Sequence, residues 1–180
     1  MNRLSMLFAV LLVGLAAVSA PARAVSPELD AYVQEAVTKF YAHTQAGKAL
    51  AARAKGMLVF PRVYKAGFVV GGEYGEGALL VNGKTDGYYS TASASLGFQI
   101  GAQRKTVILL FMNQEALSQF RESDGWQAGV DGSVALANLG AGDKIDTQTA
   151  QQPIVAFVFS NEGLMFNLNL EGTKISPIAR

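Results

Sequence analysis

Glycine recurs between short apolar runs in the stretch AKGMLVFPRVYKAGFVVGGEYGEGALL, residues 54–80. Ten of the chain's 19 glycines lie between Gly56 and Gly101. Glycine inside strands permits bulges, sharp coiling and close approach of neighbouring backbones. A sheet with so many flexible positions can curl toward a barrel. The stretch therefore predicts a bent, mostly antiparallel sheet.

The densest glycine cluster, Gly71–Gly77, does not have the features of a phosphate-binding loop. Its order is G-x-x-G-x-G, not the G-x-G-x-x-G of dinucleotide sites, and no Gly-Lys-Ser/Thr follows. The downstream residues 78–83 form a strand and turn pattern, not a helix whose N-terminus could hold a phosphate. Glu73 and Glu76 would also repel a phosphate group. The cluster is therefore interpreted as structural.

The rest of the chain alternates helical and strand patterns. An amphipathic helix is expected from Ser26-Pro27 to about Gly47, and a second short helix over residues 48–55. A third helix is expected over residues 113–122, capped by Asn113. Strands are expected at residues 57–60 (ended by Pro61), 68–70, 78–81, 92–100, 106–112, 154–159 and 164–170. This predicts an α+β fold: a curled, barrel-like, mostly antiparallel Gly-rich sheet with an N-terminal amphipathic helix and one or two further helices.

The first 24 residues have the pattern of a secretory signal peptide: a basic start, an apolar stretch over residues 4–18, and small residues at Ala22 and Ala24. The expected organisation is a signal peptide at 1–24 and one domain at 25–180, with export to the periplasm or secretion. The chain has 15 Lys and Arg; Arg3 and Arg23 would leave with the signal, which leaves 13 against 14 Asp and Glu. That balance gives no general basic field for nucleic acid. With no cysteine, the chain has no disulfide and no thiolate metal site.

Residues capable of catalysis are sparse. His43 is the single histidine and is expected to interact with carbonyls at the end of the first helix. Glu73 and Glu76 are candidate acid–base carboxylates, which keeps a hydrolase as the least favoured hypothesis. Loop carboxylates are expected to be solvated surface charges: Asp124, Asp131, Asp143 and Asp146. No catalytic residue, metal site or cofactor is therefore predicted.

Several motifs in a fixed order resemble the SYLF domain, also called the Ysc84 family. They are KGMLVFP (55–61), KAGF (65–68), GGEYGEG (71–77), SLGFQIGAQ (95–103), LLFM (109–112) and LEG (170–172). The resemblance extends from Leu50 to Ile175. It implies a non-enzymatic lipid-binding domain. Family members from eukaryotes bind phosphoinositides, and some bind actin, through a basic surface and an amphipathic N-terminal helix. For an exported bacterial member, the property expected to carry over is affinity for anionic phospholipid head groups, not actin binding.

Five basic residues are the candidate lipid contacts. Lys55, Arg62 and Lys65 flank the first strand, and Arg104 and Lys105 open another. If the two turns lie at the same end of the sheet, these side chains form a basic rim able to meet phosphate groups. The alternative is scattered solubilising charge. Additional apolar contacts are possible from Tyr64, Phe68 and Trp126. The rival function is an envelope module that binds another protein.

Overall fold

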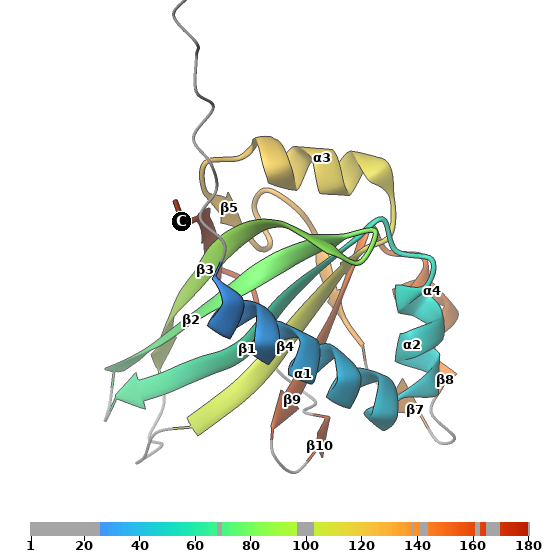
Figure 1. Cartoon of the computed structure of the whole chain (residues 1–180), viewed down its shortest axis with the longest axis horizontal. Coiled ribbons are helices and arrows are strands. Elements are labelled where there is room, and N and C mark those ends of the chain that lie inside the picture. The colour runs from blue at the N-terminus through green and yellow to red at the C-terminus, as the bar shows by residue number, and fades with distance from the viewer. Residues whose placement is uncertain are drawn as a thin grey trace, which may run out of the picture.

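The computed structural model describes residues 26–67, 70–96, 103–137, 139–140, 144–160, 163–164 and 170–179. A twisted sheet is the centre of the fold, with helices on both of its faces (Figure 1). The helices are α1 (Pro27–His43), α2 (Gln45–Ala51), α3 (Gln114–Glu122) and α4 (Thr147–Ala150). The longer strands are β1 (Gly56–Gly67), β2 (Val70–Val81), β3 (Lys84–Leu96), β4 (Gln103–Phe111) and β9 (Ile154–Ser160). The shorter strands are β5 (Trp126–Gln127), β6 (Val134–Leu136), β7 (Leu139–Gly140), β8 (Lys144–Ile145), β10 (Gly163–Leu164) and β11 (Lys174–Pro177).

The main sheet has the strand order β10-β9-β4-β1-β2-β3-β11-β5, and β6 pairs with β9. Every pairing along that order is antiparallel, and only β6 joins its neighbour in parallel within the described residues. The sheet curls into a half-barrel (Figure 1). The predicted α+β class with a curled antiparallel sheet is therefore confirmed, with three helices besides α1 in the described part of the chain.

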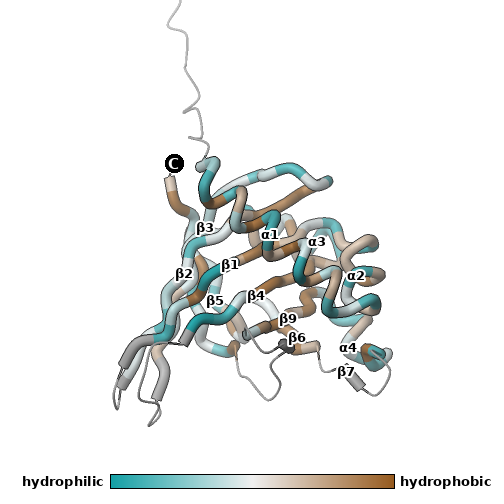
Figure 2. Tube along the Cα trace, turned by 60° about the horizontal axis from the view of Figure 1, so that its bottom comes forward, coloured by the Kyte–Doolittle hydropathy of each residue, from teal (hydrophilic) through white to brown (hydrophobic). Residues whose placement is uncertain are grey.

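Alternating side chains of the central strands pack in two separate hydrophobic cores, one on each face of the sheet. Ile108 and Leu110 of β4 pack in the cluster beneath α1, whereas Leu109 and Phe111 pack with Leu117 of α3 on the other side. All four β4 side chains are at most 3% exposed. The predicted central strand covered on both faces is confirmed. The part of the sheet between the helices is hydrophobic, and the ends of β1, β2 and β4 that extend beyond them are more hydrophilic (Figure 2).

Helix α1 lies across the first of these faces, from β3 at its start to β9 at its end (Figure 1). Its apolar stripe is buried against the sheet: Leu29, Val33, Ala36, Val37 and Phe40. The amphipathic pattern therefore belongs to core packing. None of the helices in the described residues combines the length and apolar character that crossing a membrane requires.

The predicted end of the first helix at Gly47 is wrong. Helix α1 ends at His43, and Thr44 turns to the extended conformation and caps α2 by accepting a hydrogen bond from the Gly47 amide at 2.9 Å. Gly47 lies inside α2, and glycine is needed at this position because a Cβ there would be 2.8 Å from the Phe40 ring. The second helix therefore covers Gln45–Ala51, not residues 48–55.

The third predicted helix is confirmed as α3. The Asn113 side chain caps it by accepting a hydrogen bond from the Ala116 amide at 2.8 Å.

Strand β1 does not stop at Pro61, contrary to the prediction. It continues to Gly67 through a β-bulge in which three steps on β1, from Val59 to Arg62, match two on β2, from Ala78 to Glu76. A bulge tolerates proline because it interrupts the ladder of hydrogen bonds. The extra residue also changes the side-chain alternation, so Phe60 and Val63 both pack in the core on the α3 side. Arg62 is consequently directed to the α1 face.

The predicted Asn82-Gly83 turn joins β2 to β3, and both residues have positive φ, at 52° and 75°. This is the backbone that a tight hairpin needs. Some predicted strand residues lie outside the described part of the chain: Phe68, Val69, residues 97–100 and residues 165–169.

Candidate functional site

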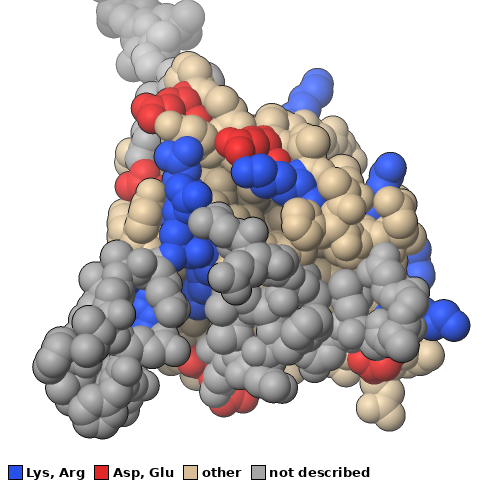
Figure 3. Space-filling view, turned by 90° about the horizontal axis from the view of Figure 1, so that it is seen from below, with Lys and Arg blue, Asp and Glu red and all other residues tan. Residues whose placement is uncertain are grey.

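A pocket of about 220 Å³ lies between α1 and the ends of β1, β4 and β9 that extend beyond the helix. Its charged lining consists of Lys39, Arg62, Arg104, Lys105 and one carboxylate, Glu35; the pocket is completed by Tyr32, Ala36, Phe40, His43, Pro61, Thr106, Phe159 and Ser160. Seen from below, Lys and Arg side chains form a stripe on this side of the molecule, beside a place where acidic and basic groups touch (Figure 3). The pocket therefore combines an apolar floor with an excess of positive charge.

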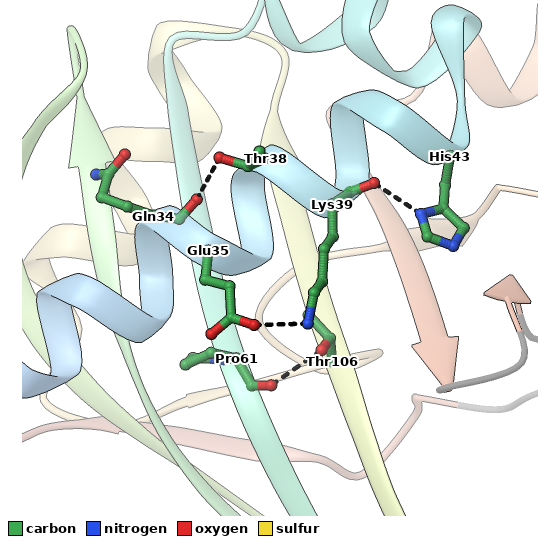
Figure 4. A network of polar contacts seen from close by, with 7 residues as sticks. All are labelled: Gln34, Glu35, Thr38, Lys39, His43, Pro61 and Thr106. Carbon is green, nitrogen blue, oxygen red and sulfur yellow. Dashed lines mark hydrogen bonds and ion pairs between the residues drawn. The ribbon is translucent and has the colours of Figure 1, made fainter.

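The helix contributes an ion pair to the pocket. Lys39 Nζ lies 2.6 Å from Glu35 Oε1, one helical turn away, and both side chains are directed toward Pro61 and Thr106 on the strands below (Figure 4). The neighbouring ammonium of Lys39 lowers the pKa of Glu35, with smaller contributions from Arg62 and Arg104. Glu35 is therefore ionised at neutral pH and neutralises part of the pocket's charge.

Arg62 is held over an aromatic ring. Its guanidinium carbon lies 3.4 Å from the centroid of Tyr32 on α1, a cation–π arrangement. Tyr32 in turn donates its hydroxyl hydrogen bond to Glu28 at 2.9 Å. The Tyr32 side chain raises the pKa of Arg62 by favouring the charged form. The bulge at Pro61 and the ring of Tyr32 together position this cation at the pocket.

Arg104 joins Arg62 on the α1 face. It is the cross-strand partner of Tyr64, two residues after Arg62, and residues two apart on a strand share a face. Arg104 is exposed and lines the same pocket. Of the five candidate contacts, these two arginines are the ones that the structure brings together on this face.

Lys65 and Lys105 lie at the same end of the sheet but direct their side chains to its other face, although Lys105 also borders the pocket. Lys65 pairs with Glu73 in the β1–β2 register, and Lys105 Nζ lies 2.6 Å from Glu73 Oε2. Only 14% of the Lys105 side chain and 16% of the Glu73 side chain are exposed, and Ser93 donates a further hydrogen bond to Glu73. Lys105 is therefore already neutralised by a protein carboxylate.

Lys55 lies away from the other four residues. Its amide donates to the Phe111 carbonyl, at the opposite end of β1 from Lys65. Ten residues of strand separate the two, which corresponds to about 30 Å. The five residues therefore do not share one edge, since Lys55 belongs to the far end of the sheet.

The candidate acid–base residues do not converge. Glu73 pairs with Ser93 and Glu76 with Ser90 in an uninterrupted register, so the two carboxylates are directed to opposite faces of β2. Among the described residues, no group of three or more histidine, aspartate or glutamate side chains is placed to hold a metal ion. His43 ends α1, and its Nδ1–H donates to the Lys39 carbonyl at 2.8 Å, as predicted.

Of the loop aspartates, Asp146 caps α4 by accepting from the Thr149 amide at 2.8 Å. Asp131 accepts from the Gln127 amide at 2.6 Å, whereas Asp124 is exposed. Asp143 lies outside the described residues. The two bonded aspartates thus serve local structure.

The aromatic residues predicted as apolar contacts differ in their exposure to solvent. Tyr64 is 49% exposed, whereas Trp126 is 2% exposed and packs against Phe120 in the core on the α3 side. Phe68 lies outside the described residues.

The sequence analysis did not predict a role for Tyr74, which is 51% exposed and is the direct cross-strand partner of Tyr64. It also missed Lys39 and Tyr32, because their role depends on where α1 crosses the sheet.

Residues 92–179 match the family model described as Ysc84, Las17-binding protein actin regulator. The matched segment runs from the middle of β3 to the end of β11 and includes Arg104 and Lys105. The motifs of β1 and β2 that also resemble the family lie before it. No curated protein matches the chain. The match over residues 92–179 agrees with the resemblance that the sequence motifs indicate, so this part of the chain is similar to the Ysc84 (SYLF) family, a family of binding domains.

Proposed function

We propose that this protein is a non-enzymatic lipid-binding domain that contacts anionic phospholipid head groups in the cell envelope. The observation that carries the proposal is the convergence of Arg62 and Arg104 on one exposed pocket beside α1. Guanidinium groups suit phosphate because they are planar, permanently charged and able to donate two parallel hydrogen bonds. The signal-peptide pattern of residues 1–24 supports an envelope location.

The charges around the pocket define the binding surface. Lys39 is paired with Glu35, and Lys105 is paired with Glu73. Arg62 and Arg104 are the two guanidinium groups that line the pocket beside these ion pairs. Tyr32 restricts Arg62, which reduces the freedom that the side chain would lose on meeting a phosphate. Two such cations give reversible, salt-sensitive attraction to an anionic surface, not permanent anchoring.

The test is co-sedimentation with phosphatidylcholine vesicles with and without phosphatidylglycerol, from low to high salt. We expect binding to the anionic vesicles only, and we expect it to weaken as salt rises. The double variant Arg62→Glu, Arg104→Glu should lose about tenfold or more of that binding. Lys55→Glu is the control, because it reverses one charge at the far end of β1, half the charge change of the double variant, and should bind like the natural chain.

Other outcomes would contradict the proposal. A vesicle affinity that changes neither with salt concentration nor with the arginine substitutions would exclude a head-group contact at this pocket. Absence of vesicle binding, with one envelope protein co-purifying at a fixed ratio, would favour the rival function of a protein-binding module.

A further inference from the structure

A row of exposed side chains crosses four strands on the α1 face, beyond the helix. Ala92 of β3, Tyr74 of β2, Tyr64 of β1 and Arg104 of β4 are successive cross-strand partners. Direct partners in an antiparallel sheet have adjacent side chains on the same face. The row is therefore continuous, and it ends in a cation that also lines the pocket described above.

The two tyrosines give the row an aromatic centre. They are half-exposed, at 49% and 51%, although most large apolar side chains in the described residues are buried. Tyr64 and Tyr74 border a second hollow of about 380 Å³, which α1 closes with Leu29 and Tyr32. Arg62 borders both hollows, so the aromatic row and the cationic pocket form one surface.

Nearby carboxylates weaken the electrostatic attraction of this surface. Glu76 accepts a hydrogen bond from the Tyr74 hydroxyl at 3.1 Å, and Glu28 accepts one from Tyr32. Both carboxylates border the same hollow. The positive charge of the arginines is therefore partly offset by these carboxylates. Binding to a bilayer then needs a further favourable free-energy contribution that does not depend on net charge.

We propose that Tyr64 and Tyr74 insert at the head-group level of a bilayer and fix which side of the molecule faces the membrane. The inference rests on the proposed function and specifies the orientation of that contact. Tyrosine suits this depth because its ring is apolar and its hydroxyl remains in contact with water or head groups. With the two rings at that depth, Arg62 and Arg104 lie at the level of the phosphates. The sheet surface beyond α1 then faces the membrane, and α3 lies on the opposite side of the sheet.

The experiment uses tryptophan as a depth reporter. Tyr64→Trp is compared with Val130→Trp, since Val130 is 73% exposed and lies next to β5, at one end of the strand order. Val130 closely follows Trp126 and Ala128, which pack in the core on the α3 side. The natural Trp126 is buried and gives a constant background. Each variant is titrated with phosphatidylglycerol-containing vesicles whose acyl chains carry bromine quenchers near the head group. Co-sedimentation of the same samples reports binding independently.

The expected result is blue-shifted, quenched emission for Tyr64→Trp and unchanged emission for Val130→Trp. In parallel, Tyr64→Ser with Tyr74→Ser should lose about tenfold in vesicle affinity, whereas Tyr64→Phe with Tyr74→Phe should retain most of it. Both tyrosines are half-exposed, so these substitutions leave the two cores intact.

Four results would overturn the inference, and they separate its failure from the failure of the proposed function. Vesicle binding with unquenched Tyr64→Trp would refute the tyrosine contact and leave head-group binding standing. Quenching of Val130→Trp instead would show that the opposite orientation is correct. No vesicle binding would refute both, and an emission shift caused only by a co-purifying protein would assign the row to a protein partner.

Discussion

Arg62 lies over the ring of Tyr32, with its guanidinium carbon 3.4 Å from the ring centroid. Two separate features produce this contact. The bulge at Pro61 directs Arg62 to the α1 face, and the burial of Leu29 and Val33 fixes the rotation of α1 so that Tyr32 meets it. The contact therefore couples helix position to the cation that we propose binds phosphate.

The first prediction concerns this coupling. Tyr32→Ala removes the ring, so Arg62 is no longer restricted and affinity for phosphatidylglycerol vesicles should fall about three- to fivefold. Tyr32→Phe keeps the ring and should bind like the natural chain, although it loses the hydrogen bond to Glu28. Co-sedimentation measures both variants. Equal affinity for Tyr32→Ala and the natural chain would show that the ring does not position Arg62 for binding.

The second prediction concerns the pH at which Glu35 titrates. Lys39 favours the carboxylate and lowers the Glu35 pKa from its ordinary value of 4.5. For a carboxyl group whose folded-state pKa is lowered, the stabilisation is present above the unfolded value and is lost as pH falls through the folded value. NMR titration of the Glu35 carboxyl should give a midpoint below 4.5, and Lys39→Gln should move it upward. An unchanged midpoint in Lys39→Gln would show that the ion pair is not formed in solution.

The third prediction is functional. Glu35 lies at the pocket as its one carboxylate and neutralises Lys39, so it opposes an approaching phosphate. Glu35→Gln should raise affinity for anionic vesicles about three- to tenfold, because it removes one negative charge and frees Lys39. Glu115→Gln on α3 is the matched control, since it makes the same charge change on the opposite side of the sheet. A rise of equal size in both variants would indicate a net-charge effect without a specific pocket.

The sequence predicts much of the fold because its strongest patterns are local. The unbroken apolar run of β4 and the apolar residues of β9 predict buried central strands, and Asn82-Gly83 predicts the hairpin. The end of α1 could not be predicted in the same way. Gly47 resembles a helix stop, but it is required inside α2 by its contact with Phe40, which is a tertiary contact.

The candidate site was only partly predictable, for a similar reason. If β1 ended at Pro61, Lys65 could fold back toward Lys55; because the strand continues through a bulge, the two lie at opposite ends. The bulge also decides the face of Arg62, and strict alternation from Phe60 would place it on the other side. Tyr74 was missed because its importance depends on register with Tyr64, which no local pattern gives.

The fourth prediction tests the ion pair on the other face of the sheet. Lys105 and Glu73 are mostly buried, so Lys105→Met alone should destabilise the fold by about 1–3 kcal/mol, because it leaves the carboxylate without its partner. Adding Glu73→Gln should recover part of that loss, a favourable coupling in a double-mutant cycle measured by urea unfolding. The exposed Glu35–Lys39 pair, treated in the same way, should show a clearly smaller coupling. Additive losses at Lys105 and Glu73 would contradict the pairing.

The last prediction tests how glycine shapes the sheet, with two glycines of the same strand. A Cβ on Gly77 would overlap the Val59 carbonyl oxygen and lie 2.6 Å from the Phe60 ring, where β2 and β1 are fully packed. Backbone cannot move aside as a flexible side chain can, so Gly77→Ala should destabilise the protein by about 1–3 kcal/mol or more. A Cβ on Gly72 would meet only the Ser93 carbonyl oxygen, at 3.7 Å, an ordinary contact on an exposed position. Gly72→Ala should therefore leave the melting temperature unchanged or raise it slightly, because alanine restricts the unfolded chain. Thermal unfolding of the two variants compares them directly, and equal melting temperatures would mean that close strand approach at Gly77 does not determine the curl of the sheet.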